Sequence, residues 1–346
     1  MKILICNLLL LFYCYSALFG QNKKSIDEIL SNQYEFKMIS SGNHMPDFNP
    51  SDGFLPEIVV LLHHGISPDE IQKYFKWDNR TIASKIGILK NANFIKTGDD
   101  GKTYPDVFVC SINDGSGITR QLNPLIKQIT DSIQKNLFAI EQEVKMIEAL
   151  RTFKFEDVSF LILSDVLLDN WQINNVENEF LKSPRTPRHG KNYYASYQEK
   201  PKNTDRESFG IYGNQMENAG TFTICRYGNM RYSKEILDLD RAIKKEYAFS
   251  KTVSQVPCPL IGNNDNDKLQ KIADTFKPAL IKILDKNKEI VRKNYQASIY
   301  SKEISFEEYF IWMYHFIYTG VTDELISRKE IKLPEENVAF YILKND

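Results

Sequence analysis

The chain lacks the short motifs that mark the common catalytic centres. It has no Gly-x-Ser-x-Gly nucleophile elbow, no His-Glu-x-x-His zinc motif, no phosphate-binding P-loop and no Gly-x-Gly-x-x-Gly dinucleotide fingerprint. Histidine is scarce, and the adjacent pair His63 and His64 would point about 100° apart on a helix. The sequence therefore predicts no metal and no cofactor, and it leaves open whether the protein is an enzyme.

Cysteine is also rare. After the first twenty residues only Cys110, Cys225 and Cys258 remain, and this odd number allows at most one disulfide within the chain. A disulfide scaffold is excluded, so the fold must depend on an apolar core. Cys225 lies in an apolar run and is predicted to be a small buried hydrophobe.

An excess of charge of one sign is missing too. The chain has 44 basic and 45 acidic residues, and without Lys2 the count is 43 against 45, a net charge of −2. This balance gives no overall attraction to nucleic acid or to an anionic membrane. The composition, 42% apolar and 26% charged, is that of a globular protein.

Long apolar runs are absent except at the start of the chain. Lys2 precedes an apolar stretch over residues 3–19, and the chain turns polar directly after Gly20. This pattern is typical of a secretory signal peptide over residues 1–20, cleaved between Gly20 and Gln21. We therefore predict an exported protein, periplasmic or secreted; the alternative is a membrane anchor formed by the uncleaved segment.

Residues 21–53 are polar and are predicted to be an extended lead-in with one short helix over 26–30. Residues 54–112 form the clearest unit. It comprises a helix over 54–64, a second helix that begins at Ser67-Pro68-Asp69-Glu70, and a third over 79–91. Ser67 and Glu70 form a capping box, and Pro68 suits the first helical position. A β-hairpin follows, with its tip at residues 98–101 and its return strand predicted over 107–109.

This order of elements resembles the bacterial repressor-like winged helix-turn-helix families. The resemblance rests on residues 66–71, 81–89 and 93–96 and covers about one sixth of the chain. In these families the third helix enters the major groove of DNA; here it carries Arg80, Lys85 and Lys90. The hairpin carries Asp99, Asp100 and Asp106, which would repel the phosphate backbone. We therefore predict a winged-helix-like module that contacts protein rather than nucleic acid.

Residues 122–150 form the longest helical pattern. Apolar residues recur there every three or four positions, with a mean spacing close to that of a coiled-coil seam. Two interpretations remain open. The helix packs on its own chain, or it pairs with the same helix of a second copy in a homodimer.

Residues 153–346 show mixed patterns of strand and helix. Strands are predicted over 158–163, 193–197, 208–212 and 221–225 and helices over 165–173, 267–298 and 305–318. The last helix has aromatic residues on all sides, which predicts that it is buried. The expected fold class is α+β, with a winged-helix-like N-terminal module, a long linking helix and a mixed C-terminal domain.

Polar side chains concentrate between residues 165 and 231. Two copies of Tyr-Gly-Asn, at residues 212–214 and 227–229, are predicted to be turns after strands. On one interpretation they are two similar turns that end strands. On the other, both turns and the preceding loop face one cleft, and this cleft suits a polar or anionic ligand. Two of the aspartates are one helical turn apart and could share a face. The candidate ligand-binding residues are Arg188, His189, Tyr212, Asn214, Arg226, Asn229, Asp165 and Asp169.

These observations favour an exported binding or scaffolding protein with an unknown polar or anionic ligand or a protein partner. One alternative is an extracytoplasmic hydrolase with its site in residues 165–231, because a carboxylate pair near a histidine is compatible with hydrolysis. It would require His189, an aspartate and an arginine to converge in one pocket. The other alternative is a membrane-anchored winged-helix regulator that binds DNA.

Overall fold

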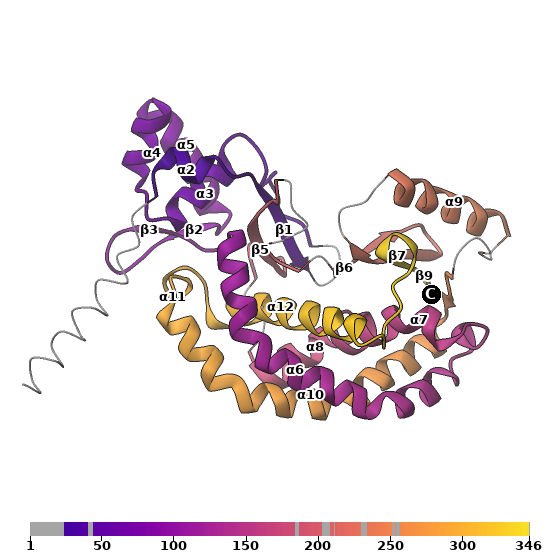
Figure 1. The fold of residues 1–346 in the computed structure, drawn as a ribbon. Helices are drawn as coiled ribbons and strands as arrows, with labels where there is room; N and C mark the ends of the chain where they lie inside the picture. The colour runs from indigo at the N-terminus through magenta and orange to yellow at the C-terminus, as the bar shows by residue number, and fades with distance from the viewer. Residues whose placement is uncertain are drawn as a thin grey trace, which may run out of the picture.

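The structure is a computed structural model that describes residues 24–40, 44–183, 187–202, 208–210, 212–229, 234–250, 253 and 257–345. The signal peptide predicted over residues 1–20 lies outside these ranges. Within them the chain has the predicted α+β class. Short helices lie at one end, long helices cross the body, and a sheet with one covering helix lies at the other end (Figure 1).

The N-terminal module consists of short helices and a hairpin. Its elements are α2 (Ile26–Leu30), α3 (Leu55–His63), α4 (Pro68–Phe75), α5 (Asn79–Asn91), β2 (Ile95–Thr97) and β3 (Thr103–Pro105). The capping box at α4 is confirmed, because the Ser67 hydroxyl accepts from the N–H of Glu70 and the Glu70 carboxylate accepts from the N–H of Ser67. Asp78 caps α5 in the same way through the N–H of Thr81. The helices and the hairpin tip therefore lie where the sequence predicts them, but the return strand is β3 and not the segment predicted over 107–109, which belongs to another sheet.

A three-stranded sheet attaches this module to the rest of the chain. β1 (Tyr34–Ser40) pairs antiparallel with β5 (Tyr193–Glu199), and β4 (Phe108–Cys110) pairs parallel with the other edge of β5. The lead-in over residues 21–53 thus holds a strand that the sequence analysis missed. Tyr193 and Tyr197 of β5 belong to the apolar core of the module, so this core extends past the boundary predicted at residue 112.

The long linking helix, α6, spans Ile112–Val144 and so begins and ends earlier than predicted. Ser111 caps it, in a capping box with Asp114. Its apolar stripe, which includes Ile126 and Ile133, is buried in the main core with α10 (Asn263–Ala297) and α12 (Phe306–Ser327). The face that a homodimer would use is therefore covered by the chain itself.

The segment after α6 departs most from the prediction. A short 3-10 turn, η1 (Glu148–Leu150), is followed by helical segments that replace the strand predicted over 158–163. These are α7 (Phe155–Phe160), the π-helical η2 (Leu161–Val166), α8 (Ile173–Asn175) and the π-helical η3 (Val176–Leu181). An unbroken apolar run suits a buried strand or a helix that is buried on all sides. Here it is the latter, because residues 158–168 are buried throughout. α12 is buried in the same core, as its aromatic residues predict.

The second sheet has the strand order β6 (Tyr212–Asn218), β7 (Phe222–Asn229), β9 (Val338–Lys344) and β8 (Leu260–Ile261). The two Tyr-Gly-Asn copies lie in paired strands, not in turns, so that prediction is wrong. They pair with each other in antiparallel register, Tyr212 opposite Asn229 and Asn214 opposite Tyr227. Gly228 has a φ of 141°, and a Cβ there would lie 2.2 Å from the carbonyl oxygen of Asn337. A glycine is needed because two backbones approach closely.

Three further elements complete the described chain. α9 (Lys234–Ser250) packs on β7 and β9 in a separate apolar cluster, α11 (Tyr300–Glu303) joins α10 to α12, and the 3-10 turn η4 (Glu335–Asn337) precedes β9. No helix in the described ranges combines the length and the apolar character that crossing a bilayer requires.

Candidate functional site

The predicted site residues do not form one cleft. Arg188 and His189 lie beside the N-terminal module, whereas Asp165, Asp169, Tyr212 and Asn214 lie in and around the main core, and Arg226 faces α9. The N-terminal module and α9 are at opposite ends of the molecule (Figure 1). Asn229 ends β7, and its side chain is outside the described part.

Arg188 connects the module to the helical body. Its guanidinium donates to the Glu308 carboxylate at 2.7 and 2.9 Å, to the carbonyl of Asp106 at 2.7 Å and to the carbonyl of Asn93. Burial alone would lower the pKa of Arg188, but the Glu308 and Asp106 carboxylates raise it. With all of its partners inside the protein, this arginine holds α5, β4 and α12 together and is not directed at a ligand.

His189 is exposed and lines a cavity of about 310 Å³ beside α5. Apolar and aromatic side chains form much of the wall: Phe48, Ile88, Ala92 and Tyr193. The polar lining residues are Asp47, Asn91, Arg188, His189 and Lys191. Lys191 bonds the Asp47 carboxylate and, at 2.9 Å, the carbonyl of Met45. Since the charges of Arg188 and Lys191 are matched by neighbours, the cavity suits an apolar group better than the anion that the sequence predicts.

Asp165 and Asp169 do lie together, as their spacing predicts, but inside the main core. Asn214 donates to Asp165 Oδ2 at 2.9 Å and the backbone N–H of Asn170 donates to Oδ1 at 3.3 Å. Burial raises the pKa of Asp165 well above its ordinary value, and the neighbouring Asp169 raises it further. Burial raises the pKa of Asp169 to about 7. Both carboxyl groups therefore bind their protons more tightly than an exposed aspartate does.

Hydroxyl groups surround this acid pair. Ser164 bonds Tyr227 at 2.5 Å and Thr322 at 2.6 Å, and Tyr318 donates to the carbonyl of Tyr212 at 2.8 Å. Neither cavity described here is lined by any of these residues. Among the described residues the arrangement is a polar network that is buried within the core.

Arg226 forms a separate ion-pair cluster between the second sheet and α9. Its guanidinium lies 3.2 Å from Asp240 and 3.7 Å from Glu217, and Lys244 bridges the same two carboxylates at 2.8 and 2.7 Å. These contacts attach α9 to β6 and β7, which is a structural role.

The three cysteines and His63 also have structural surroundings. The cysteines Cys110, Cys225 and Cys258 are free and buried, and burial raises the pKa of each thiol. His63 Nδ1 lies 2.9 Å from both oxygens of Glu303, which is fully buried on α11. Within the described ranges, no group of three histidine, cysteine, aspartate or glutamate side chains could hold a metal ion.

A second cavity, of about 620 Å³, lies between β1 and the start of α3. Its lining comes from residues 30–36 and 51–60 and from Lys200. Most of these residues belong to the predicted lead-in, and none of them was predicted to be a site residue. The alternation of Tyr34, Phe36 and Met38 with polar residues was a strand signal that would have drawn attention to this segment.

Comparison of the chain with protein-family models, curated proteins and solved structures found no match. The resemblance to winged-helix families thus remains a prediction from the element order. Function has to be argued from the geometry.

Proposed function

We propose that this protein is an exported binding protein without catalytic activity, and that its winged-helix-like module contacts a protein partner through α5. The observation that supports the proposal is the cavity beside α5. It is open at the surface of the helix that the family resemblance assigns to recognition, and apolar side chains form much of its wall.

Exposed apolar side chains flank this cavity. Ile88, on α5, is 42% exposed, and Met45, whose carbonyl accepts from Lys191, is 56% exposed. Contacts between proteins are centred on apolar anchors that fill such depressions, with polar groups around them. The expected partner is therefore a protein segment that inserts one apolar side chain between Ile88 and Tyr193.

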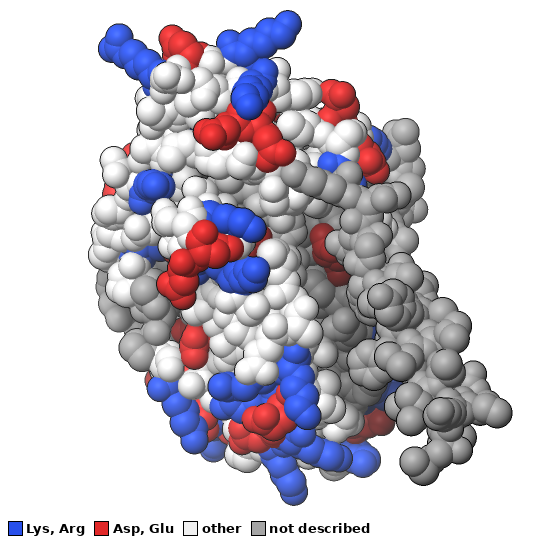
Figure 2. All heavy atoms as spheres, turned by 90° about the vertical axis from the view of Figure 1, so that its left-hand side faces the viewer, with Lys and Arg blue, Asp and Glu red and all other residues white. Residues whose placement is uncertain are grey.

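The charges of the module argue against DNA. Residues 54–112 contain seven basic and seven acidic side chains, and Figure 2 shows both signs mixed over the upper end of the molecule, which carries α4 and α5. Lys85 donates to the carbonyl of Gly53 and lies over the ring of Trp77, while Lys96 pairs with Asp106 at 3.2 Å. The equal number of acidic side chains in the module offsets the remaining cations and weakens its attraction to phosphates.

The hydrolase alternative has no geometric support. His189 is exposed beside α5, while Asp165 and Asp169 are enclosed in the main core. Arg188 lines the same cavity as His189 but pairs with Glu308, and Arg226 pairs with Asp240 of α9. The convergence that hydrolysis requires is therefore missing among the described residues.

Site-specific crosslinking tests the proposal. A photoreactive phenylalanine analogue is placed at Ile88, or at Leu237 on α9, which is similarly exposed at 45%, in the full chain in its native cells. We expect a discrete crosslinked protein from position 88 alone. After purification, Ile88→Asp should weaken its binding about tenfold or more, whereas Leu237→Asp should not.

Equal crosslinking at both positions, or no crosslink at 88, would contradict the proposal. Sub-micromolar DNA binding that falls steeply with salt in a gel-shift assay would favour the regulator instead. Export is tested separately by N-terminal sequencing of the protein isolated from cells. We expect Gln21 as the first residue, and a chain in the membrane fraction that begins at Met1 would contradict cleavage.

A further inference from the structure

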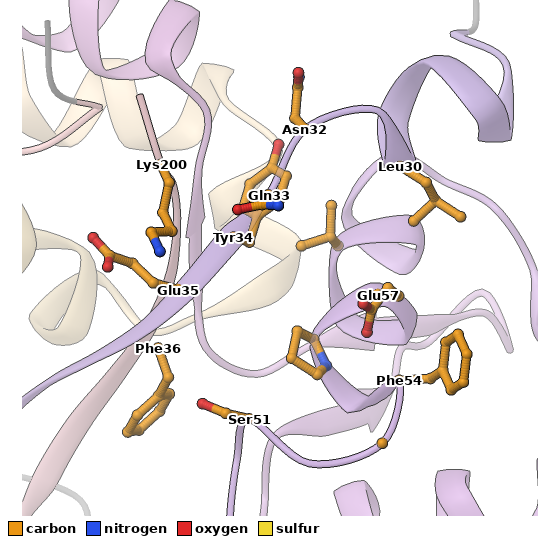
Figure 3. Close-up of a pocket in the computed structure, with 13 residues that line it drawn as sticks. Leu30, Asn32, Gln33, Tyr34, Glu35, Phe36, Ser51, Phe54, Glu57 and Lys200 are labelled. Carbon is orange, nitrogen blue, oxygen red and sulfur yellow. The ribbon is translucent and has the colours of Figure 1, made fainter. Parts of the chain in front are cut away.

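The cavity between β1 and α3 is formed by three segments that are distant in sequence. The end of α2 and β1 supply one wall, residues 51–57 and the first turns of α3 supply the other, and Lys200 follows β5 at the rim (Figure 3). Its volume of about 620 Å³ is within the range of pockets that hold small molecules. β1 and β5 pair along their full length, so this wall is fixed before any ligand binds.

Glu57, in the first turn of α3, lines this cavity with an incompletely satisfied carboxylate. Its Oε2 atom is buried and has no hydrogen-bond donor among the described residues. A buried acceptor without a donor is costly, and rotation of the carboxylate toward the cavity would let a ligand supply the missing N–H. A charge-assisted bond from an ammonium group is the strongest such contact.

Lys200 carries the complementary charge. Its backbone N–H donates to the carbonyl of Gln33 at 2.8 Å, which fixes the residue beside β1. Its ammonium group has no ion-pair partner within 4.0 Å among the described residues, whereas the nearby Glu35 pairs with Lys37 at 3.5 Å. Figure 3 shows Lys200 and Glu57 on different sides of the cavity.

We propose that this cavity binds a small zwitterion, a free amino acid or the equivalent backbone of a short peptide. The ligand's ammonium group would donate to Glu57, and its carboxylate would accept from Lys200. Aromatic side chains complete the lining, since Tyr34, Phe36 and Phe54 border the cavity. They suit an apolar part of the ligand and the face of a cation. A ligand with only one of the two charges would leave either Glu57 or Lys200 unmatched.

Calorimetric titration of the purified full chain tests this. The probes are the twenty L-amino acids, taken singly, and for each that binds the amine without its carboxylate and the acid without its ammonium group. We expect at least one amino acid to bind, and both truncated probes to bind about tenfold more weakly or worse. Glu57→Gln and Lys200→Met should each weaken the binding of the amino acid by a similar factor.

Lys37→Met is the matched control, because it removes a lysine of β1 that does not line the cavity. We expect this variant to bind the amino acid with a dissociation constant within twofold of that of the original chain. Ile88→Asp, which alters only the proposed partner surface, should do the same. If no amino acid binds at millimolar concentration, or if Glu57→Gln and Lys200→Met both bind as the original chain does, the proposal is overturned. Retained thermal unfolding of each variant shows that a loss of binding is not a loss of fold.

Discussion

Replacing Asp169 by asparagine should stabilise the protein at and above neutral pH. The side chain is 7% exposed, and burial raises its pKa from 3.8 to about 7. Between pH 4 and 7 the native chain therefore holds a proton that the unfolded chain has released. Because the unfolded state binds fewer protons, the free energy of unfolding falls as the pH rises through this window and levels off above it.

The size of the effect follows from the shift. One pKa unit corresponds to about 1.4 kcal/mol, so a shift from 3.8 to about 7 costs at most about 4 kcal/mol above pH 7. Asparagine has the shape of the protonated acid and does not titrate. Tyr318 contacts Asp169 and gives its own proton to the carbonyl of Tyr212. Its oxygen can therefore accept from the new amide.

Urea unfolding at pH 4, 6 and 8 measures this. We expect Asp169→Asn to be about 2 to 4 kcal/mol more stable than the original chain at pH 8 and nearly equal to it at pH 4. Asp99→Asn, on the exposed tip of the hairpin, is the control and should leave the pH dependence unchanged. An Asp169→Asn variant with the original pH slope, or one that is less stable at pH 8, would refute the reasoning.

Three other predictions concern stability and use the same unfolding assay. Gly228→Ala should lower the free energy of unfolding by about 2 kcal/mol or more, because the added Cβ meets backbone. Gly117→Ala in α6 has open space around the added Cβ, so it should be neutral or stabilising by up to about 1 kcal/mol. Equal effects of the two variants would contradict this. Arg188→Met should lower the free energy of unfolding by about 3 to 5 kcal/mol, because it leaves Glu308 buried without its partner. Adding Glu308→Leu should restore part of the lost stability. If it restored none, the ion-pair explanation would be contradicted. His63→Gln should lower the free energy of unfolding below pH 6.5, because the native pKa of the imidazole is raised. Above pH 6.5 the variant should lose less stability with rising pH than the original chain does. An unchanged dependence of stability on pH would contradict the ion pair with Glu303.

Local physical chemistry made part of the fold readable from the sequence. The helices α4, α5 and α12 begin where a side chain caps the free N–H groups, at Ser67, Asp78 and Ser305. Such a cap and the residues that it serves lie within one turn, so no knowledge of distant chain is needed. The same holds for the all-round aromatic pattern that predicted a buried α12.

What depends on distant chain could not be predicted. The partner of β1 is more than 150 positions away, from Tyr34 to Glu199, and nothing local selects it. The two Tyr-Gly-Asn copies suit turns equally well, and only the structure shows that they pair with each other and that Gly228 lies against the backbone of Asn337. Arg188 and Arg226 were grouped because they are near in sequence, although each pairs with carboxylates of a different element.

Two buried clusters make the free energy of unfolding fall as the pH rises, from independent causes and in different ranges of pH. Burial alone would lower the pKa of His63, but the Glu303 carboxylate raises it, so this ion pair between α3 and α11 is complete below pH 6.5 and is lost as the pH rises through the raised pKa. Asp169, in the main core, also binds its proton more tightly in the native chain. Both titrations make the folded protein more stable under mildly acidic conditions. Because His63 and Asp169 share no partner, their effects should add, and the double variant Asp169→Asn with His63→Gln should lose both contributions to the slope. If either single variant removed the whole pH dependence, the two clusters would have to be coupled through α12, which packs in the main core and follows α11 directly in the chain.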